Sequence, residues 1–303
     1  MILDNIPQTP MKSGFGVLTM GLATGLYLLA SLTSAAPSTP ESSWERFSVI
    51  TAPNPHTNAE LDTYLQQVDT LTQQGDLEGA VAVYQKALEK HPDHIDLYFD
   101  LAVTFTELGK LSEAIAQYQK VLSLDPVHTD ALYNLGLVRY ANGEVALGVS
   151  HFQKAISLQP QNPDAHIWLG QGYLLQKRFK EAVQAWQRAI ELDPQAVYAY
   201  NSLGDFYSQQ GNLPLAITYY RQALAQPDQD GIPVSAHTLA HHSLGKVFQQ
   251  QGNLHEALWE YQECLRLAPE FEPAQLNLFQ LQEVLKEKST PLPLAGRPIF
   301  TPL

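Results

Sequence analysis

The sequence has few cations and a single cysteine, and both shortages exclude classes of function. Its 303 residues contain 18 Lys and Arg against 31 Asp and Glu, a formal net charge of −13. Nucleic-acid binding needs clustered cations opposite the phosphates, so we expect no nucleic-acid partner. The lone cysteine, Cys264, excludes an internal disulfide framework and a zinc site of four thiolates. It lies far beyond the N-terminal apolar segment, which excludes a lipoprotein anchor.

Short catalytic motifs are also missing. The chain contains neither a glycine-rich phosphate loop nor a Gly-x-Ser-x-Gly nucleophile elbow. No segment outside the repeats described below is long enough to form an appended catalytic domain. We therefore expect a non-enzymatic protein that uses no cofactor.

One long apolar run stands near the N-terminus, after a short flank, 1–13. Residues 14–32, GFGVLTMGLATGLYLLASL, are uncharged and number 19, close to the roughly 20 that a membrane-spanning helix needs. The following segment, 33–58, is rich in Ser, Thr and Pro, a composition typical of a tether. We predict a single-pass membrane anchor. The alternative is a signal peptide cleaved near Ala36, which would leave a periplasmic or secreted protein, although Pro37 disfavours that cleavage.

The rest of the chain is dominated by a 34-residue period. The phrases LDPVHTDALYNLG (124–136), LQPQNPDAHIWLG (158–170) and LDPQAVYAYNSLG (192–204) begin 34 residues apart. A fixed period of this size is typical of a solenoid of stacked repeats. With the proline set at place 32 of each unit, the units are 61–94, 95–128, 129–162, 163–196, 197–230 and 238–271.

Each unit is predicted to form two helices. A glycine after about fourteen residues closes the first helix, and a proline follows the second helix, which it cannot continue. Place 20 is always small, which lets the two helices approach closely. Place 24 is always aromatic, which fills the space against the next unit. The residues at place 24 are Tyr84, Tyr118, Phe152, Trp186, Tyr220 and Tyr261.

This simultaneous agreement of small, aromatic, glycine and proline places resembles the tetratricopeptide-repeat (TPR) family over residues 61–271. The resemblance implies an all-α fold, a right-handed superhelix of helix-turn-helix units. Residues 272–288 resemble the capping helix of such arrays, and 289–303 form a Pro-rich tail. The sequence departs from the pattern at DGIPVSA (230–236), which is extra length before the sixth unit. The family's common function, which we expect here, is to hold another protein in a concave groove.

The predicted groove is acidic and aromatic. At the places of the first helix that line the groove in this family, the sequence supplies no cation before Lys246. We predict that the groove prefers a basic or aromatic-containing segment. Acids at place 2, such as Asp96, also suit a helix start, whereas Asp69 and Asp100 lie further along their helices. The predicted partner-binding residues are Asp69, Asp96, Phe99, Asp100, Glu107, Tyr133, Tyr140, Ile167, Trp168 and Leu174.

One specialised function of the family is not expected. Its carboxylate clamp for chaperone C-termini requires Lys, Asn and Arg at set places of three successive units. Here only Asn134 matches, and two of the cations are replaced by Asp164 and Trp168.

The histidines are candidate metal ligands, and the cysteine is a candidate nucleophile. The pair His91 and His94, and the group at 237, 241 and 242, have spacings that a metal could use. Neither group shows a third shared ligand, so we expect no metal. Cys264 stands where other units have Ala or Val, which predicts a buried packing residue.

The sequence thus predicts a membrane-tethered TPR scaffold that acts as an adaptor or assembly factor. The alternative is an exported periplasmic TPR protein that binds a ligand or a metal.

Overall fold

The computed structural model describes residues 59–229 and 234–289. In these ranges it contains thirteen α-helices and no strand, which confirms the all-α prediction. None of these helices is long and apolar enough to cross a membrane. The predicted anchor at 14–32, the tether and residues 290–303 lie outside the described ranges. The chain divides into two compact units, Met1–Ala182 and Val183–Leu303.

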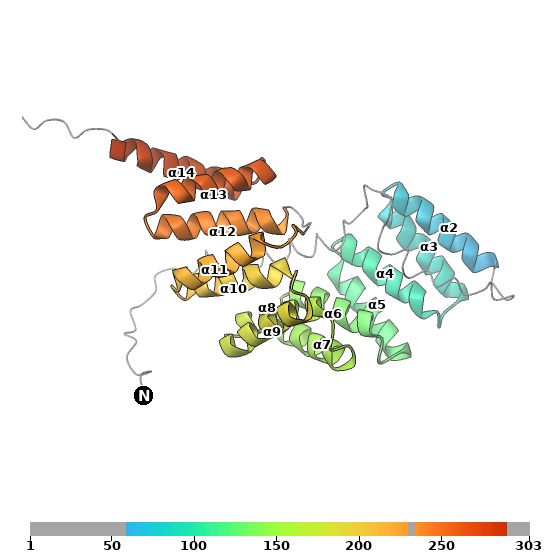
Figure 1. Cartoon of the computed structure of the whole chain (residues 1–303). Helices are drawn as coiled ribbons and strands as arrows, with labels where there is room; N and C mark the ends of the chain where they lie inside the picture. The colour runs from blue at the N-terminus through green and yellow to red at the C-terminus, as the bar shows by residue number, and fades with distance from the viewer. Residues whose placement is uncertain (1–58, 230–233, 290–303) are drawn as a thin grey trace, which may run out of the picture. The chain divides into compact units, whose positions relative to one another are not determined.

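The first unit is built from consecutive helical hairpins (Figure 1). Each pair consists of two antiparallel helices joined by a short turn that follows the 34-residue period. The pairs are α2 (Ala59–Gln73) with α3 (Leu77–Lys90), α4 (Ile95–Glu107) with α5 (Leu111–Leu124), and α6 (Thr129–Ala141) with α7 (Val145–Leu158). Helix α8 (Pro163–Leu175) follows, and α9 (Phe179–Leu192) contains the boundary between the units.

The second unit continues the same design. Its hairpins are α10 (Val197–Gln209) with α11 (Leu213–Leu224) and α12 (Ala236–Gln250) with α13 (Leu254–Leu267). Helix α14 (Glu272–Ser289) packs beside α13 at the end of the described chain (Figure 1).

The turns inside the hairpins follow from the glycine positions. A residue in the left-handed region ends the first helix, and glycine adopts this conformation without steric cost. Gly75, Gly109, Gly143 and Gly211 have φ between +70° and +80°. At the fourth turn the sequence has Lys177 instead of glycine, with φ +60°. Among the residues that the structure describes, Lys177 is the single non-glycine residue with a positive φ.

The core consists of the rings at place 24 and the small residues that they contact. Tyr118, Phe152, Trp186 and Tyr261 are at most 1% exposed. Removing that much aromatic surface from water stabilises the stack by several kcal/mol for each ring before entropy is counted. Several of these rings fill the space inside their own hairpin: Phe152, Tyr220 and Tyr261 lie directly over Gly136, Gly204 and Gly245 of the partner helix.

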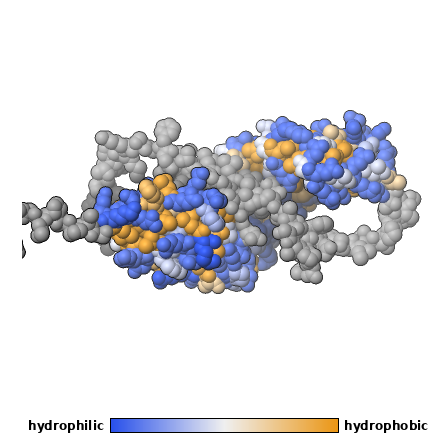
Figure 2. Space-filling view, turned by 90° about the horizontal axis from the view of Figure 1, so that it is seen from above, coloured by the Kyte–Doolittle hydropathy of each residue, from blue (hydrophilic) through white to orange (hydrophobic). Residues whose placement is uncertain are grey.

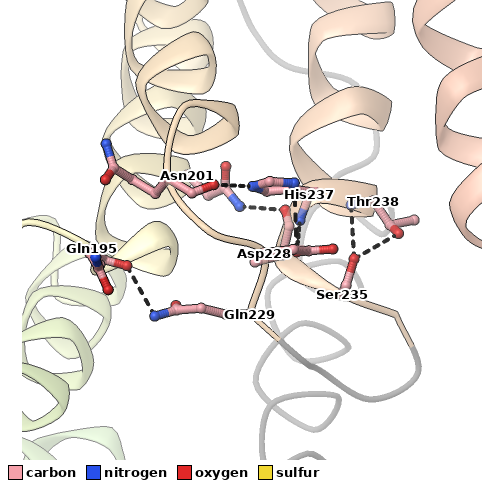
Figure 3. A network of polar contacts seen from close by, with 9 residues as sticks. Gln195, Asn201, Asp228, Gln229, Ser235, His237 and Thr238 are labelled. Carbon is pink, nitrogen blue, oxygen red and sulfur yellow. Dashed lines mark hydrogen bonds and ion pairs between the residues drawn. The ribbon is translucent and has the colours of Figure 1, made fainter.

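The extra residues before the sixth pair are held by a polar network on the second unit (Figure 3). Asn201 Nδ2 donates to the Ala236 carbonyl at 2.9 Å, and the amide of His237 donates to Asp228 Oδ1 at 2.9 Å. Gln229 Nε2 donates to the Gln195 carbonyl at 3.0 Å. Ser235 caps α12 by accepting from the amide of Thr238. These bonds fix both ends of the insertion, whose residues 230–233 lie outside the described ranges.

Helix α14 is only partly covered. It buries Ala274 and Leu281 against the preceding helices, while Leu276 and Phe279 are 57% and 62% exposed. Figure 2 shows apolar residues interspersed with polar ones on the face of the second unit that is seen from above.

Candidate functional site

All ten predicted partner-binding residues lie on the first helices of the pairs in the first unit, α2, α4, α6 and α8. They differ in exposure. Asp69 and Asp96 are exposed, and Phe99, Asp100, Glu107, Tyr133 and Leu174 are half-buried. Tyr140, Ile167 and Trp168 are only 4%, 7% and 4% exposed. These three side chains therefore offer little surface to a partner, and their ring and aliphatic atoms pack inside the repeat stack instead.

The acidic residues lie within electrostatic range of one another. Asp96 and Asp100 stand one turn apart on α4, and Asp69 is on α2, the first helix of the preceding pair. The pKa of Asp100 is raised to about 6, chiefly because burial penalises the charged carboxylate, and further because Asp96 and Asp69 repel it. Burial also raises the pKa of Glu107. None of these four acids takes part in an ion pair within the described ranges.

Two tyrosines of the core approach the same acids. Burial raises the pKa of Tyr84, and so do the charges of Asp100, Asp69 and Glu107. Burial raises the pKa of Tyr118, and the charges of Glu107 and Asp100 raise it further. A side-chain hydrogen bond with Thr106 lowers this pKa. Their position at place 24 predicts packing alone. The sequence gives no distinguishing signal, since place 24 carries Tyr in the two units that supply these acids but also in the fifth and sixth units.

Phe99 supplies the aromatic part of this region. Its ring stacks on His128 with centroids 5.2 Å apart, and it meets the edge of Tyr118 at 5.8 Å. Because the ring is held on two sides, it stays in place beside Asp100 with part of its surface open to solvent. We call Asp69, Asp96, Phe99, Asp100 and Glu107 the acidic–aromatic surface.

The remaining predicted residues lie on α6 and α8, and three of them, Tyr133, Tyr140 and Trp168, are aromatic. Tyr140 and Trp168 make an edge contact with centroids 5.4 Å apart, and Tyr133 lies 6.0 Å from Phe152. The hydroxyl of Tyr133 is buried. This group supports the helix packing next to the acidic–aromatic surface rather than extending it.

The second unit contains an acid that sequence reasoning missed. Asp205 on α10 stands at place 9 of its repeat, the place of Asp69 in the first. Its side chain is exposed, yet it accepts from the Tyr220 hydroxyl at 2.6 Å and from the Ser243 hydroxyl at 3.3 Å. The pKa of Asp205 is raised, chiefly because surrounding protein atoms displace part of its hydration. The matching place in the repeat was the signal that could have identified it.

The histidines do not converge on a metal site. His237 Nε2 contacts the Gln226 carbonyl, His241 Nδ1 contacts Glu260, and His242 Nε2 accepts from Asn277, so the three rings point to different partners. Over the residues that the structure describes, no three side chains of metal-binding type are grouped to hold an ion. Cys264 is fully buried, and burial raises its pKa to about 12, so its thiol is unreactive at neutral pH.

Three solved structures illustrate the similarity of fold. A crystal structure of MamA is 28% identical, covers 52% of this chain and 92% of its own, and has a TM-score of 0.50. PilF from Pseudomonas aeruginosa is 21% identical, with coverages of 74% and 98% and a TM-score of 0.58. PilW, described as a widely conserved type IV pilus biogenesis factor, is 19% identical, with coverages of 75% and 99% and a TM-score of 0.61. No curated protein matches the chain significantly.

Family models give the more specific result. Models described as tetratricopeptide repeat match residues 71–135, 130–162 and 195–270, and one described as TPR repeat matches 171–211. These matches fall on the helical hairpins described above. The chain therefore belongs to the tetratricopeptide-repeat family, whose members generally serve as scaffolds for protein interactions.

Proposed function

We propose that this protein is a non-enzymatic scaffold that holds a basic, aromatic-containing segment of a partner protein on its acidic–aromatic surface. The observation that carries the proposal is the environment of Asp100. Its pKa of about 6 reflects burial beside two further carboxylates, with no cation paired to any of them. Carboxylates held together in this way repel one another, and a Lys or Arg from a partner would relieve that repulsion.

The geometry also accounts for an aromatic preference. Phe99 presents part of its ring next to Asp100, and its contacts with His128 and Tyr118 hold it in place. A partner side chain that packs on this ring brings its neighbouring cation within reach of the carboxylates. A preorganised ring and charge group loses little conformational entropy on binding, which favours affinity.

The surface residues also explain why other TPR functions do not fit. A clamp for a C-terminal carboxylate needs cations, and the acidic–aromatic surface has none among its five residues. Catalysis would need an arrangement of nucleophile, base and oxyanion donors. The acids here lie beside tyrosines whose pKa values are raised, so those tyrosines are poor proton donors at neutral pH.

We further propose that residues 14–32 and 33–58 tether the array to a membrane, so that the scaffold acts as an adaptor or assembly factor there. The support is the length and composition of the two segments. Intact mass of the mature protein tests this point. A mass that includes residues 1–36 agrees with an anchor, and loss of these residues favours the exported, periplasmic form.

The partner-binding proposal is tested by capture from a lysate of the source cells with the full-length chain, followed by mass identification. The variant carries Asp100→Lys with Glu107→Lys. The control carries Glu89→Lys with Glu113→Lys, which makes the same charge change at exposed positions on α3 and α5. We expect partners that are retained by the wild type and the control but lost by the variant. Equal loss from both charge-reversed proteins would contradict a specific surface.

A further inference from the structure

The second unit contains a cleft that the proposed function does not use. It has a volume of about 370 Å³ and is lined by Arg221 on α11, Phe248 on α12, and His255, Glu256, Trp259 and Glu260 on α13. It is a shallow depression that is open to solvent rather than an enclosed cavity. All six lining residues belong to one compact unit, so the cleft is a feature of that unit alone.

Trp259 is the unusual residue of this cleft. It stands at place 22 of the sixth repeat, where the other repeats have Ala82, Ala116, Ser150, Gln184 and Thr218. Its side chain is 54% exposed. Core packing cannot account for a large ring that is mostly in solvent at a place otherwise small or polar. An exposed aromatic side chain beside a cleft is typical of a binding surface.

The wall behind Trp259 is rigid. His241 on α12 meets the indole edge-on, with ring centroids 5.9 Å apart. His241 Nδ1 is 2.7 Å from Glu260 Oε2, and these side chains are only 12% and 8% exposed. Glu260 is therefore held from behind by His241, and Trp259 rests against a fixed histidine. The cleft is preformed, so binding would require little reordering.

The chemistry of the lining fits an extended proline-rich segment that carries one cation. Such a segment keeps all its backbone carbonyls free of internal hydrogen bonds. The cleft offers donors for these carbonyls in the Trp259 indole N–H, the Arg221 guanidinium and the His255 ring. Prolines pack on exposed aromatic rings in known recognition sites of this kind. Glu256 is exposed and can pair with a cation of the segment.

The chain itself contains a segment of this chemistry. Residues 290–303, TPLPLAGRPIFTPL, include four prolines, no acidic side chain and a single cation, Arg297. They follow directly on α14, whose last turns lie beside the first turns of α13 (Figure 1). Leu285 of α14 and Leu254 of α13 border the same buried cluster. Helix α14, which precedes the segment, thus ends close to the end of α13 that carries His255, Glu256 and Trp259.

The reach is sufficient. Arg297 lies eight residues beyond Ser289, which in an extended proline-rich conformation spans about 25 Å at 3.1 Å per residue. The cleft residues of α13 occupy only its first two turns. Attachment to the same molecule also gives an effective concentration on the order of millimolar, so even weak intrinsic binding populates the docked state.

We propose that residues 290–303 dock into the cleft of the same molecule, with prolines on Trp259 and Arg297 paired to Glu256. Docking would cover the exposed indole and make the cleft unavailable to proline-rich segments of other proteins. This site is separate from the acidic–aromatic surface, so either proposal can fail without the other.

The test uses the full-length chain in detergent with a nitroxide attached at Thr301→Cys. Cys264 is buried and unreactive, so labelling of the native protein is selective for the new thiol. Tryptophan is labelled with ¹⁵N, and the indole N–H peak of Trp259 is assigned by Trp259→Phe. We expect the nitroxide to abolish the Trp259 peak and to leave the peak of buried Trp186 visible. A Trp259 peak that keeps its full intensity overturns the proposal.

Charge exchange tests the pairing. Arg297→Glu should restore the Trp259 peak, and Glu256→Arg added to it should abolish the peak again. The matched control adds Glu270→Arg instead, at an exposed acid outside the cleft, and should leave the peak visible. Broadening that persists in Arg297→Glu, or an equal effect of both arginines, contradicts the proposed contact. A mixing experiment distinguishes docking within one molecule from docking between molecules. Chains that carry the nitroxide but no ¹⁵N are mixed with chains that carry ¹⁵N but no nitroxide. The Trp259 peak should then stay intact, and its loss would overturn docking within one molecule.

Discussion

Arg178 and Tyr173 are joined across the turn between α8 and α9 in two ways. The Arg178 amide donates to the Tyr173 carbonyl at 2.9 Å, and its guanidinium carbon lies 4.2 Å from the centre of the Tyr173 ring. The Lys177 amide donates to the Leu174 carbonyl at 2.9 Å, so the two bonds together form a Schellman closure around Lys177. This turn therefore has the geometry of the glycine turns without the glycine.

Lys177→Gly should therefore stabilise the first unit. The left-handed conformation costs a residue with a side chain about 1–2 kcal/mol, which glycine would avoid. Glycine also has greater conformational freedom in the unfolded chain, and this offsets part of the stabilisation. We expect a net increase of about 0.5–1 kcal/mol in the free energy of unfolding, measured by urea denaturation. Lys177→Ala, which keeps the strained backbone, serves as the control and should give no such gain.

Gly245→Ala should destabilise the second unit. A Cβ atom at Gly245 would lie 2.5 Å from Cε1 of the Tyr261 ring, which is fully buried and cannot move freely. Overpacking of this kind costs about 1–3 kcal/mol. Thermal unfolding followed by circular dichroism should show a lower Tm. Gln250→Ala, an exposed position on the same helix, should leave Tm nearly unchanged, and an equal drop in both variants would contradict the packing argument.

Acid should stabilise the first unit through Asp100. Its folded pKa of about 6 lies above the ordinary value of 3.8, so the folded state binds more protons between these values. Stability from this group therefore rises as the pH falls from 7 to 5, by about 1 kcal/mol. Asp100→Asn should raise stability at pH 7, because it removes the buried charge, and should remove this part of the pH dependence. Hydrogen exchange of the amides of α4 and α5 measures this stability at each pH. An Asp100→Asn variant that is less stable than the wild type at pH 7 would contradict the assignment.

His242 should have the opposite effect on the second unit. Burial, and then the charge of Lys246, lower its pKa to about 4, below the ordinary 6.5. The unfolded state binds more protons between these values, so stability is lost as the pH falls from 7 to 5, by about 2 kcal/mol. The hydrogen bond from Asn277 to the neutral ring is lost when the ring is protonated. His242→Gln should flatten this loss, as measured by hydrogen exchange of α12 and α14.

The periodic features could be predicted from the sequence because they recur in successive repeats. Glycine every 34 residues predicts the turns, and aromatic residues at place 24 predict the buried rings, as Tyr118 and Tyr261 show. Lys177 interrupts the glycine series, yet the surrounding pattern still predicts a turn there. Local backbone chemistry, repeated in this way, determines the hairpins.

Features that depend on contacts between repeats were harder to predict from the sequence. Trp168 stands at a groove-lining place, but the edge contact with Tyr140 buries it, and no single repeat shows that contact. The role of Tyr84 beside Asp100 and Asp69 depends on how neighbouring pairs stack. Trp259 was overlooked because its place carries no pattern in the family, and only its 54% exposure reveals it.

Proton release on binding tests the central claim most directly. If a cation from a partner pairs with Asp100, the pKa of this carboxyl must fall from about 6. At pH 6 roughly half a proton should then be released for each peptide bound. Calorimetric titration of the full-length chain with a synthetic peptide of alternating Lys and Phe, in two buffers of different ionisation enthalpy, measures that number. The account predicts proton release by the wild type and by the control Glu89→Lys with Glu113→Lys, and no release by Asp100→Asn. Binding to the wild type without proton release, or release that survives in Asp100→Asn, would contradict it.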